Sequence, residues 1–351
     1  MIDADTRSSM EMIRDSAGAI VTPGNLTRVR GLRYALPGFD RAVWREICDL
    51  GWPALRLPED KGGVGLGTLP LCALAEELGR GLVPEPLIPA VLAASMLEGD
   101  ALEAHLGGTR LVLPAWQDSR KALMPDDPLS IENGTVTARK LNVSGAAGAD
   151  DFLVIGSDGA MLVAADAPGV TVTPLGTQDG GHVAQVAFDR APGRLIAAAP
   201  IPALAEAALA TSAYLLGMME AALDITTAYL KTRVQFGKTI GQFQILQHMA
   251  VDLKLEAEVT RASVESTAEA WDRNGATTET LAAVSRTKAR ASDAAMKVTR
   301  DCVQLHGGIG FTDEHDIGLY LRKAMVAAAQ FGGASAHRAR FLDLKPIREV
   351  A

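Results

Sequence analysis

The chain has 351 residues, of which 48% are hydrophobic and only 5% aromatic, and its formal net charge is −8. This length predicts two or three domains, and the low aromatic content favours packed helices. The negative charge gives no electrostatic basis for nucleic-acid binding, which depends on clustered Lys and Arg. Three scattered cysteines without a C-x-x-C pair indicate a reducing compartment rather than a disulfide framework or a zinc site.

Targeting and membrane segments are not indicated by the sequence. The first residues are acidic and lack the basic and apolar parts of a secretory signal, so we expect the mature protein to begin there. The apolar stretch 87–97 is too short to span a bilayer, and Glu206 and Glu220 interrupt the stretch 203–223. We therefore expect a soluble, cytoplasmic protein without membrane partners.

Residues 1–108 show a helical pattern broken by glycine and proline loops. Amphipathic segments at 44–50 and 69–82 flank the turn-rich sequence LPEDKGGVG at 57–65. We predict an all-α domain here. The glycines at 62–67 do not sit between a strand and a helix, so a dinucleotide-binding fingerprint is rejected.

Residues 109–198 change to short apolar or alternating runs separated by turn dipeptides. The runs lie at 111–113, 135–137 and 152–155, with Asn133-Gly134 and Asp158-Gly159 as turns. This pattern predicts a small antiparallel β domain.

Residues 199–351 return to long helical patterns. Asn274-Gly275 separates a helix predicted over 244–271 from one over 278–305, and Gly307-Gly308 should end the second. Short connections and one-sided apolar stripes predict a four-helix bundle. The expected fold is therefore mainly α with a small β domain in the middle.

The sequence RVQFGKTIGQFQ at 233–244 carries a planar charged fork, two amides and a turn glycine. Arg233 suits a pyrophosphate, Gln235 and Gln244 supply donors and acceptors, and Gly237 permits a tight turn. An Arg and two Gln at a helix end would mean little, but all twelve residues resemble the bundle signature of the acyl-CoA dehydrogenase family. The resemblance implies FAD as cofactor, with Phe236 packed against its adenosine side.

A second stretch, QLHGGIGFT at 304–312, resembles the same family and is followed by Glu314 and by LYLRKA at 319–324. Adjacent glycines let a ligand lie on backbone amides, although a glycine helix cap is the ordinary alternative. In the family this segment touches the adenine end of an FAD held mainly by the neighbouring subunit. The cofactor contacts that the resemblance implies here are Gln304, Leu305, Gly307, Gly308 and Gly310.

Two positions of the middle region depart from the family pattern. Residues 134–150 resemble its flavin-binding segment, where Ser144 takes the place of a Thr that bonds the flavin ring. Asn142 takes the place of a Trp that stacks on that ring. The flavin-binding stretch expected near residues 116–119 is not recognisable. The six histidines form no H-E-x-x-H pattern, so no metal is predicted.

The general base of the family is missing from its usual position. Family chemistry is α,β-dehydrogenation of an acyl-CoA: a Glu removes the C2 proton while hydride passes from C3 to the flavin. Residues 330–335 read QFGGAS, so Gly332 replaces that Glu. A minority of members place the Glu on the first bundle helix, where the alignment falls on Ala207. Glu206 lies one residue, about 100 degrees, away and is expected on the surface.

Three interpretations remain open. The retained motifs are those that reach a neighbour's FAD, so the chain resembles the base-lacking subunits of heteromeric acyl-CoA dehydrogenases from bacteria that degrade steroid side chains. It would then pair with a homologous subunit in a heterotetramer, act on an acyl-CoA and deliver electrons to an external acceptor. The alternatives are a self-sufficient homotetramer using Glu206 or Glu314, and a flavin-free scaffold or regulatory protein.

Overall fold

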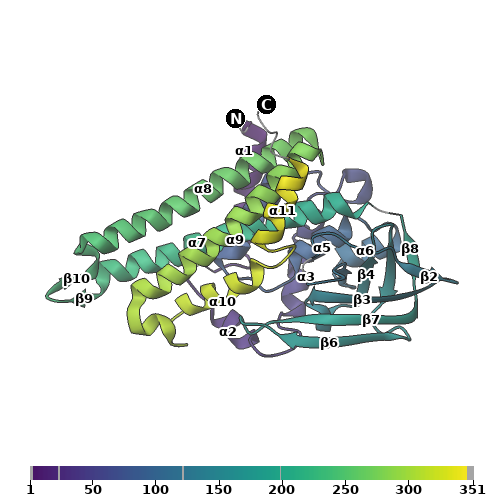
Figure 1. Ribbon diagram of the computed structural model, residues 1–351, viewed down its shortest axis with the longest axis horizontal. Helices are drawn as coiled ribbons and strands as arrows, with labels where there is room; N and C mark the ends of the chain where they lie inside the picture. The colour runs from purple at the N-terminus through teal and green to yellow at the C-terminus, as the bar shows by residue number, and fades with distance from the viewer. Residues whose placement is uncertain (1–2, 23, 121, 198, 346–351) are drawn as a thin grey trace. The chain divides into compact units, whose positions relative to one another are not determined.

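The computed structural model describes residues 3–22, 24–120, 122–197 and 199–345. Helices precede and follow a block of strands in the expected order (Figure 1). The helices before the strands are α1 (Ala4–Ala17), α2 (Thr27–Leu32), α3 (Arg41–Asp49), α4 (Thr68–Arg80), α5 (Leu87–Ala94) and α6 (Asp100–Leu106). The helices after them are α7 (Pro200–Thr232), α8 (Gln244–Asn274), α9 (Thr278–His306), α10 (Ile317–Ala327) and α11 (Ala334–Leu344).

Between the two sets of helices, the described residues form eight strands in two four-stranded sheets. They are β1 (Val112–Ala115), β2 (Ser130–Glu132), β3 (Thr135–Ser144), β4 (Asp151–Ile155), β5 (Ala160–Ala164), β6 (Val170–Gly176), β7 (His182–Pro192) and β8 (Arg194–Ile196). The sheet orders are β1-β4-β5-β8 and β2-β3-β7-β6. Our expectation of a purely antiparallel region needs one correction, because β1 pairs parallel with β4. Asn133 and Gly134, both at positive φ, make the predicted turn between β2 and β3.

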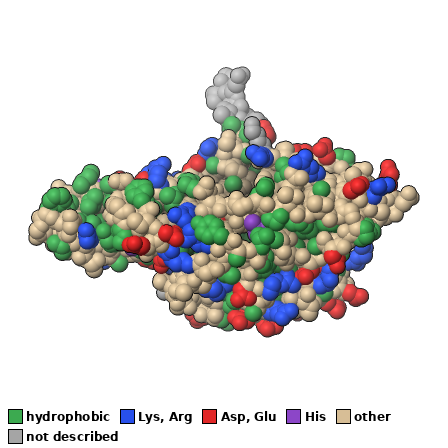
Figure 2. Space-filling view, turned by 90° about the horizontal axis from the view of Figure 1, so that it is seen from below, with side chains coloured by type: hydrophobic (Ala, Val, Ile, Leu, Met, Phe, Trp, Pro, Cys, Tyr) green, Lys and Arg blue, Asp and Glu red, His purple; other side chains and the backbone are tan. Residues whose placement is uncertain are grey.

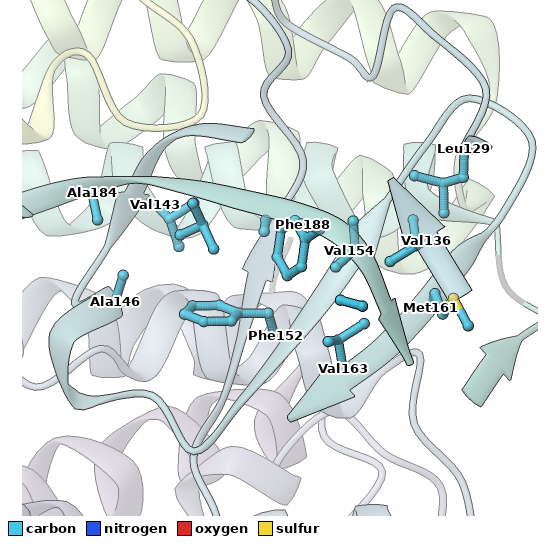
Figure 3. Close-up of a cluster of buried hydrophobic side chains, with 13 residues drawn as sticks. Leu129, Val136, Val143, Ala146, Phe152, Val154, Met161, Val163, Ala184 and Phe188 are labelled. Carbon is cyan, nitrogen blue, oxygen red and sulfur yellow. The ribbon is translucent and has the colours of Figure 1, made fainter. Parts of the chain in front are cut away.

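The inner faces of these strands form a hydrophobic core (Figure 3). Residues of β7 alternate between buried and half-exposed, so Ala184, Val186 and Phe188 point inward. Phe152 of β4 meets Phe188 edge to face, with ring centroids 6.0 Å apart. This core holds β3, which carries Asn142 and Ser144.

Contacts within the chain group it into two units that are not continuous in sequence. One unit draws on residues 1–29, 72–83 and 208–351, and the other on residues 30–71 and 84–207. The helices therefore divide between both units, and the predicted boundaries 1–108, 109–198 and 199–351 stay a prediction. The β strands from β1 to β8 all belong to the second unit.

The first unit is built around the long helix α7. Its residue Gly217 lies against α4 so closely that an added Cβ would stand 1.8 Å from the Glu76 carbonyl oxygen. Glu76 of α4 is buried and accepts hydrogen bonds from Arg14 and Arg261 at 2.8–3.1 Å. Burial alone would raise the pKa of Glu76, but these two guanidinium groups hold it below its usual range. Glu76 is thus a buried, ion-paired residue of α4.

Helix α7 is the one described helix that is long and apolar enough to cross a membrane by length and composition. In its most apolar window, however, 78% is buried inside the protein, as in a core helix. The three cysteines, Cys48, Cys72 and Cys302, are buried on α3, α4 and α9.

Candidate functional site

The first sequence motif forms a hairpin between α7 and α8. Strands β9 (Val234–Gln235) and β10 (Lys238–Thr239) pair antiparallel around Phe236 and Gly237. Both loop residues have positive φ, 53° and 78°, as a two-residue type I′ turn requires. Gly237 suits this conformation, whereas an aromatic residue at positive φ is strained. The motif therefore places Phe236 in a costly conformation at the very end of a projection.

Phe236 is also 92% exposed, the largest exposure among the large hydrophobic side chains of the described residues. Its ring meets only the edge of Phe243 within the hairpin, at 6.2 Å between centroids. Figure 2 shows hydrophobic side chains gathered at the end of the molecule that carries this hairpin. Burial within this chain does not compensate for the strain at Phe236.

The polar residues of the motif face solvent beside that ring. Arg233, Gln235 and Gln244 are all exposed, as a ligand-binding role requires. The backbone beneath them is fixed, because the Ile240 amide donates to the Arg233 carbonyl at 2.8 Å. Gly241 packs so closely that an added Cβ would lie 2.7 Å from the Leu230 carbonyl oxygen. A rigid loop thus presents one guanidinium and two amides outward.

The second motif joins the first through a stack of rings. Helix α9 ends at His306, and Gly307 at φ 65° ends it as predicted. The His306 ring stacks on Tyr229, one turn before Arg233, with centroids 4.5 Å apart. The His315 ring lies 4.6 Å from that of His306. The structure therefore brings both motifs together, with Tyr229 as a contact that sequence reasoning missed.

The predicted residues of the second motif divide into two groups. Gln304, Gly307 and Gly308 are exposed, and a Cβ added at Gly308 would meet nothing within 4 Å, so its backbone is open to a ligand. Leu305 is only 6% exposed and Gly310 is buried. An added Cβ at Gly310 would stand 2.5 Å from the Val303 carbonyl oxygen, which gives that glycine a packing role.

Ser144 and Asn142 lie on β3 in the other unit, beside a register shift between Lys140 and Val143. Asn142 is exposed at φ 52°, and its amide donates to Gln117 Oε1 at 2.9 Å. Lys140 is buried and donates to Asp118 at 2.5 Å. Hydrogen bonds therefore connect β3 to residues 117 and 118, in the segment where the flavin-binding stretch was expected. The side chain at position 142 is an amide rather than an aromatic ring.

The position of the missing base lies in an internally bonded loop between α10 and α11, in which Gly332 itself is buried. Lys288 of α9 is fully buried and donates to the carbonyl oxygens of Ala328 and Gly332 at 2.9 and 3.0 Å, and to Ser292 at 3.0 Å. Burial lowers the pKa of Lys288 to about 7. Gly332 has φ 102°, a conformation that only glycine adopts readily.

His337 of α11 holds the same loop from the other side. Its Nε2 lies 2.9 Å from the Phe331 carbonyl oxygen, and Phe331 has φ 52°. Burial, with the nearby charge of Lys288, lowers the pKa of His337 to about 3, so the ring is neutral. The roles of Lys288 and His337 were not predicted from the sequence. The one sequence feature that could have indicated a buried cation is the position of Lys288 on an alanine-rich face of its helix.

Glu206 is not the surface residue that we expected. Arg56 donates to both of its carboxylate oxygens, from Nε at 2.8 Å and Nη2 at 3.0 Å, and the Glu206 side chain is only 18% exposed. A carboxylate held by a two-point guanidinium contact is stabilised in its charged form. Glu314, the other carboxylate considered, is exposed. No group of three or more metal-ligating side chains occurs within the described ranges.

Comparison with known proteins settles the family. The description "acyl-CoA dehydrogenase, N-terminal domain" matches residues 8–104, and "acyl-CoA dehydrogenase, C-terminal domain" matches residues 198–341. Acyl-CoA dehydrogenase IpdE2 of Mycolicibacterium smegmatis is 32% identical over 325 residues, covering 92% of this chain and 94% of that protein. The chain belongs to the acyl-CoA dehydrogenase family.

Solved structures of this family share the fold over nearly the whole chain. A variant of the Tcur3481–Tcur3483 steroid ACAD is similar at a TM-score of 0.85 and 30% identity, covering 97% of each chain. The ChsE4–ChsE5 complex from Mycobacterium tuberculosis is similar at a TM-score of 0.82 and 25% identity, covering 97% of this chain and 96% of that one. The predicted acyl-CoA dehydrogenase fold is thereby confirmed.

Proposed function

We propose that the chain is the non-catalytic subunit of a heteromeric acyl-CoA dehydrogenase and completes the FAD site of an adjacent homologous subunit. The loop at Gly332 carries this proposal. A base must offer a proton acceptor to the substrate, yet this loop has glycine at that position. Lys288 and His337 bind its backbone carbonyls in the interior of the bundle. The adjacent subunit would supply the Glu.

The exposed residues of the two motifs fit an FAD held mainly by a neighbour. Arg233 offers a charge-assisted contact to the pyrophosphate, and Gln235, Gln244 and Gln304 offer amides. Gly307 and Gly308 leave backbone open at the end of α9. Phe236 would bury its exposed ring against the adenosine side, which would offset its backbone strain. FAD supplies the hydride acceptor when bound; these residues hold it in place.

The residues of this chain that would contact the flavin ring offer fewer contacts than the family pattern. Ser144 keeps a hydroxyl, but Asn142 is hydrogen-bonded to Gln117 and offers no stacking face. We infer that the reaction is α,β-dehydrogenation of an acyl-CoA at the partner's site, with electrons passing to an external acceptor. The similarity to steroid ACAD and to the two-component complexes favours a heterotetramer and a bulky acyl group. We place this assembly in the cytoplasm.

One experiment distinguishes the proposed function from two other functions. A self-sufficient homotetramer would use Glu206 or Glu314 as base, but the first is bound by Arg56. A flavin-free scaffold would keep the fold without any cofactor.

The test is to purify the chain alone and together with a homologous acyl-CoA dehydrogenase chain that carries the Glu base. FAD per chain is measured by absorbance, and acyl-CoA oxidation by reduction of an artificial electron acceptor. We expect flavin and activity only in the pair. Full flavin loading and activity of the lone chain would establish the homotetramer, and a flavin-free pair would establish the scaffold.

A further inference from the structure

The sequence contains two Asn-Gly dipeptides, Asn133-Gly134 in the turn of the β2–β3 hairpin and Asn274-Gly275 at the end of α8. Such a dipeptide is chemically reactive, because the backbone nitrogen of the glycine can attack the side-chain carbonyl carbon of the asparagine. Glycine has no Cβ to obstruct this approach. All four residues are exposed. Access to water therefore does not distinguish the two dipeptides, but their hydrogen bonds do.

The dipeptide at the end of α8 has its nucleophile occupied. Asn274 is the last residue of the helix, and the Gly275 amide donates to the Trp271 carbonyl oxygen at 2.8 Å. The Gly275 carbonyl oxygen accepts from the Thr277 amide at 3.0 Å, which fixes the following peptide as well. The Gly275 nitrogen can reach the Asn274 side chain only when this end of the helix opens. Folding therefore protects this dipeptide.

The dipeptide in the β2–β3 hairpin lacks this protection. Within the described ranges, neither the Asn133 side chain nor the Gly134 amide forms a hydrogen bond. The Gly134 carbonyl oxygen accepts from the Gly193 amide at 3.2 Å, which leaves the nitrogen unengaged. A Cβ added at Gly134 would meet nothing within 4 Å, so the space around the reacting atoms is open.

The strand before this turn is held by few contacts. β2 lies at the edge of its sheet (Figure 1) and pairs with β3 at three positions. Every residue from Ser130 to Gly134 is exposed. Segments with so little buried surface open locally at a low cost in free energy. The turn can therefore rotate into the geometry that the attack requires without unfolding the core.

The two Asp-Gly dipeptides of the chain, which begin at Asp158 and Asp179, could form the same cyclic product. Their carboxylates are held in place, however. Asp158 Oδ1 accepts from the Leu129 amide at 3.0 Å, and Asp179 Oδ1 accepts from the Gly181 amide at 3.1 Å. An ionised carboxylate is also a poorer electrophile than a carboxamide. Asn133 thus combines the reactive side chain with a free neighbouring amide.

We infer that Asn133 is a site of spontaneous deamidation, at which the folded chain acquires an aspartate or an isoaspartate. The Gly134 nitrogen loses its proton and bonds to Asn133 Cγ, while the bond from Cγ to the side-chain nitrogen breaks and ammonia leaves. The product is a five-membered succinimide. Water then opens the ring: attack at Cγ gives aspartate, and attack at the main-chain carbonyl gives isoaspartate. Water is the one co-reactant, and no atom is oxidised or reduced.

Both products alter the β2–β3 hairpin. Each places a new carboxylate beside Glu132, and isoaspartate adds one atom to the main chain of a two-residue turn. The type I′ turn joins strands in which Glu132 faces Thr135, and a longer main chain no longer fits this pairing. β2 should detach, whereas β3 and β7 should stay paired over their shared core. Amide hydrogen exchange should therefore become faster at residues 130–134 and stay unchanged across β7.

The test follows both dipeptides in the same full-length chain, incubated at mildly alkaline pH. Peptide mass spectrometry measures the mass increase on replacing the amide by a carboxylate. In the folded chain we expect Asn133 to react at least about tenfold faster than Asn274, because Asn274 reacts only when its helix end opens. In urea the two rates should become similar, since the local sequence alone then sets them. An Asn274 that reacts as fast as Asn133 in the folded chain would overturn the inference.

Asn133→Gly is the matched control variant. A Gly-Gly turn keeps the type I′ geometry and removes the reactive carboxamide. Isoaspartate is measured by methyl transfer from S-adenosylmethionine, catalysed by an isoaspartate methyltransferase added as a reagent. Aged wild type should be methylated, and the aged control variant should be methylated far less. Equal methylation of the two would also contradict the inference. No flavin or partner enters these measurements, so the outcome is independent of the proposed function.

Discussion

The hairpin at residues 233–244 and the loop at residues 328–333 lie in the same unit and differ in where their interactions are directed. The hairpin has a fixed backbone, but Arg233, Gln235 and Phe236 point into solvent. The loop instead accepts bonds on its backbone from buried Lys288 and His337. The exposed polar side chains and the strained Phe236 are the observations from which we infer that the hairpin binds an external ligand. The loop at residues 328–333 needs no external ligand to account for its conformation, because Lys288 and His337 bond its backbone carbonyls.

The two segments therefore differ in whether their polar groups are satisfied inside the chain or are open to solvent. On the proposed function, the hairpin binds the cofactor of a neighbour, whereas the loop at Gly332 has only a structural role. Substitutions in the loop should therefore change stability, and substitutions in the hairpin should change cofactor binding.

The largest effect is expected from the pH dependence of Lys288. The unfolded chain holds this proton up to pH 10.5, whereas the folded chain releases it at about pH 7. Between these values the unfolded state binds more protons, so the free energy of unfolding rises with pH by up to about 1.4 kcal/mol per unit. Urea unfolding across pH 7 to 10.5 measures this slope.

The variant Lys288→Met is the control for that slope. It should be less stable by about 3 kcal/mol at pH 9, because the carbonyls of Ala328 and Gly332 lose the two N–H donors that the neutral amine offers them. The slope between pH 7 and 10.5 should be smaller by the contribution of this one group. An unchanged slope in Lys288→Met would show that other groups cause the pH dependence.

The next effect concerns the hairpin. Arg233→Ala should weaken FAD retention by the assembled pair about tenfold to hundredfold, since a charge-assisted contact is lost. Its thermal stability should not change, because the Arg233 side chain is exposed. Lys231→Ala removes an exposed cation two residues away and should leave both quantities unchanged. Equal flavin affinity in wild type and Arg233→Ala would mean that the motif serves folding only.

The sequence predicts features that depend on neighbouring residues better than features that depend on residues far apart in the chain. The order of helices and strands followed from periodicity and turn residues, so α8 and α9 begin at the predicted residues. Glycine positions such as Gly237 and Gly307 were readable because positive φ is a local property. The parallel pairing of β1 with β4 was not readable, because it depends on a partner about forty residues away.

The site shows the same limit. Arg56 meets Glu206 across 150 residues, and no local pattern indicates which cation will reach a given carboxylate. Tyr229 and Lys288 were missed for the same reason, since their roles arise only from tertiary packing. Leu305 and Gly310 were assigned to the cofactor along with their neighbours, but burial separates them from the exposed Gly307 and Gly308.

A smaller effect should follow from restoring a carboxylate to the loop. Gly332→Glu places a side chain at φ 102°, which should cost about 1–2 kcal/mol of stability. Gly333→Glu is the matched control, because Gly333 has φ −78° and open space around an added Cβ. Thermal unfolding compares the two. We expect no acyl-CoA oxidation by lone Gly332→Glu; activity there would mean that the chain binds flavin fully by itself.

The smallest effect isolates the strain at Phe236. Asparagine tolerates positive φ and is favoured at the first position of a type I′ turn, so Phe236→Asn should stabilise the chain by roughly 0.5–1 kcal/mol. The same change removes the exposed ring and should weaken FAD retention by the pair. Val234→Thr, on the same hairpin, should alter neither, because it keeps a β-branched strand residue. If the ring served folding, its removal would destabilise the chain, so a loss of stability in Phe236→Asn would contradict a binding role. A residue kept for its ligand should instead show higher stability and weaker flavin retention when it is replaced.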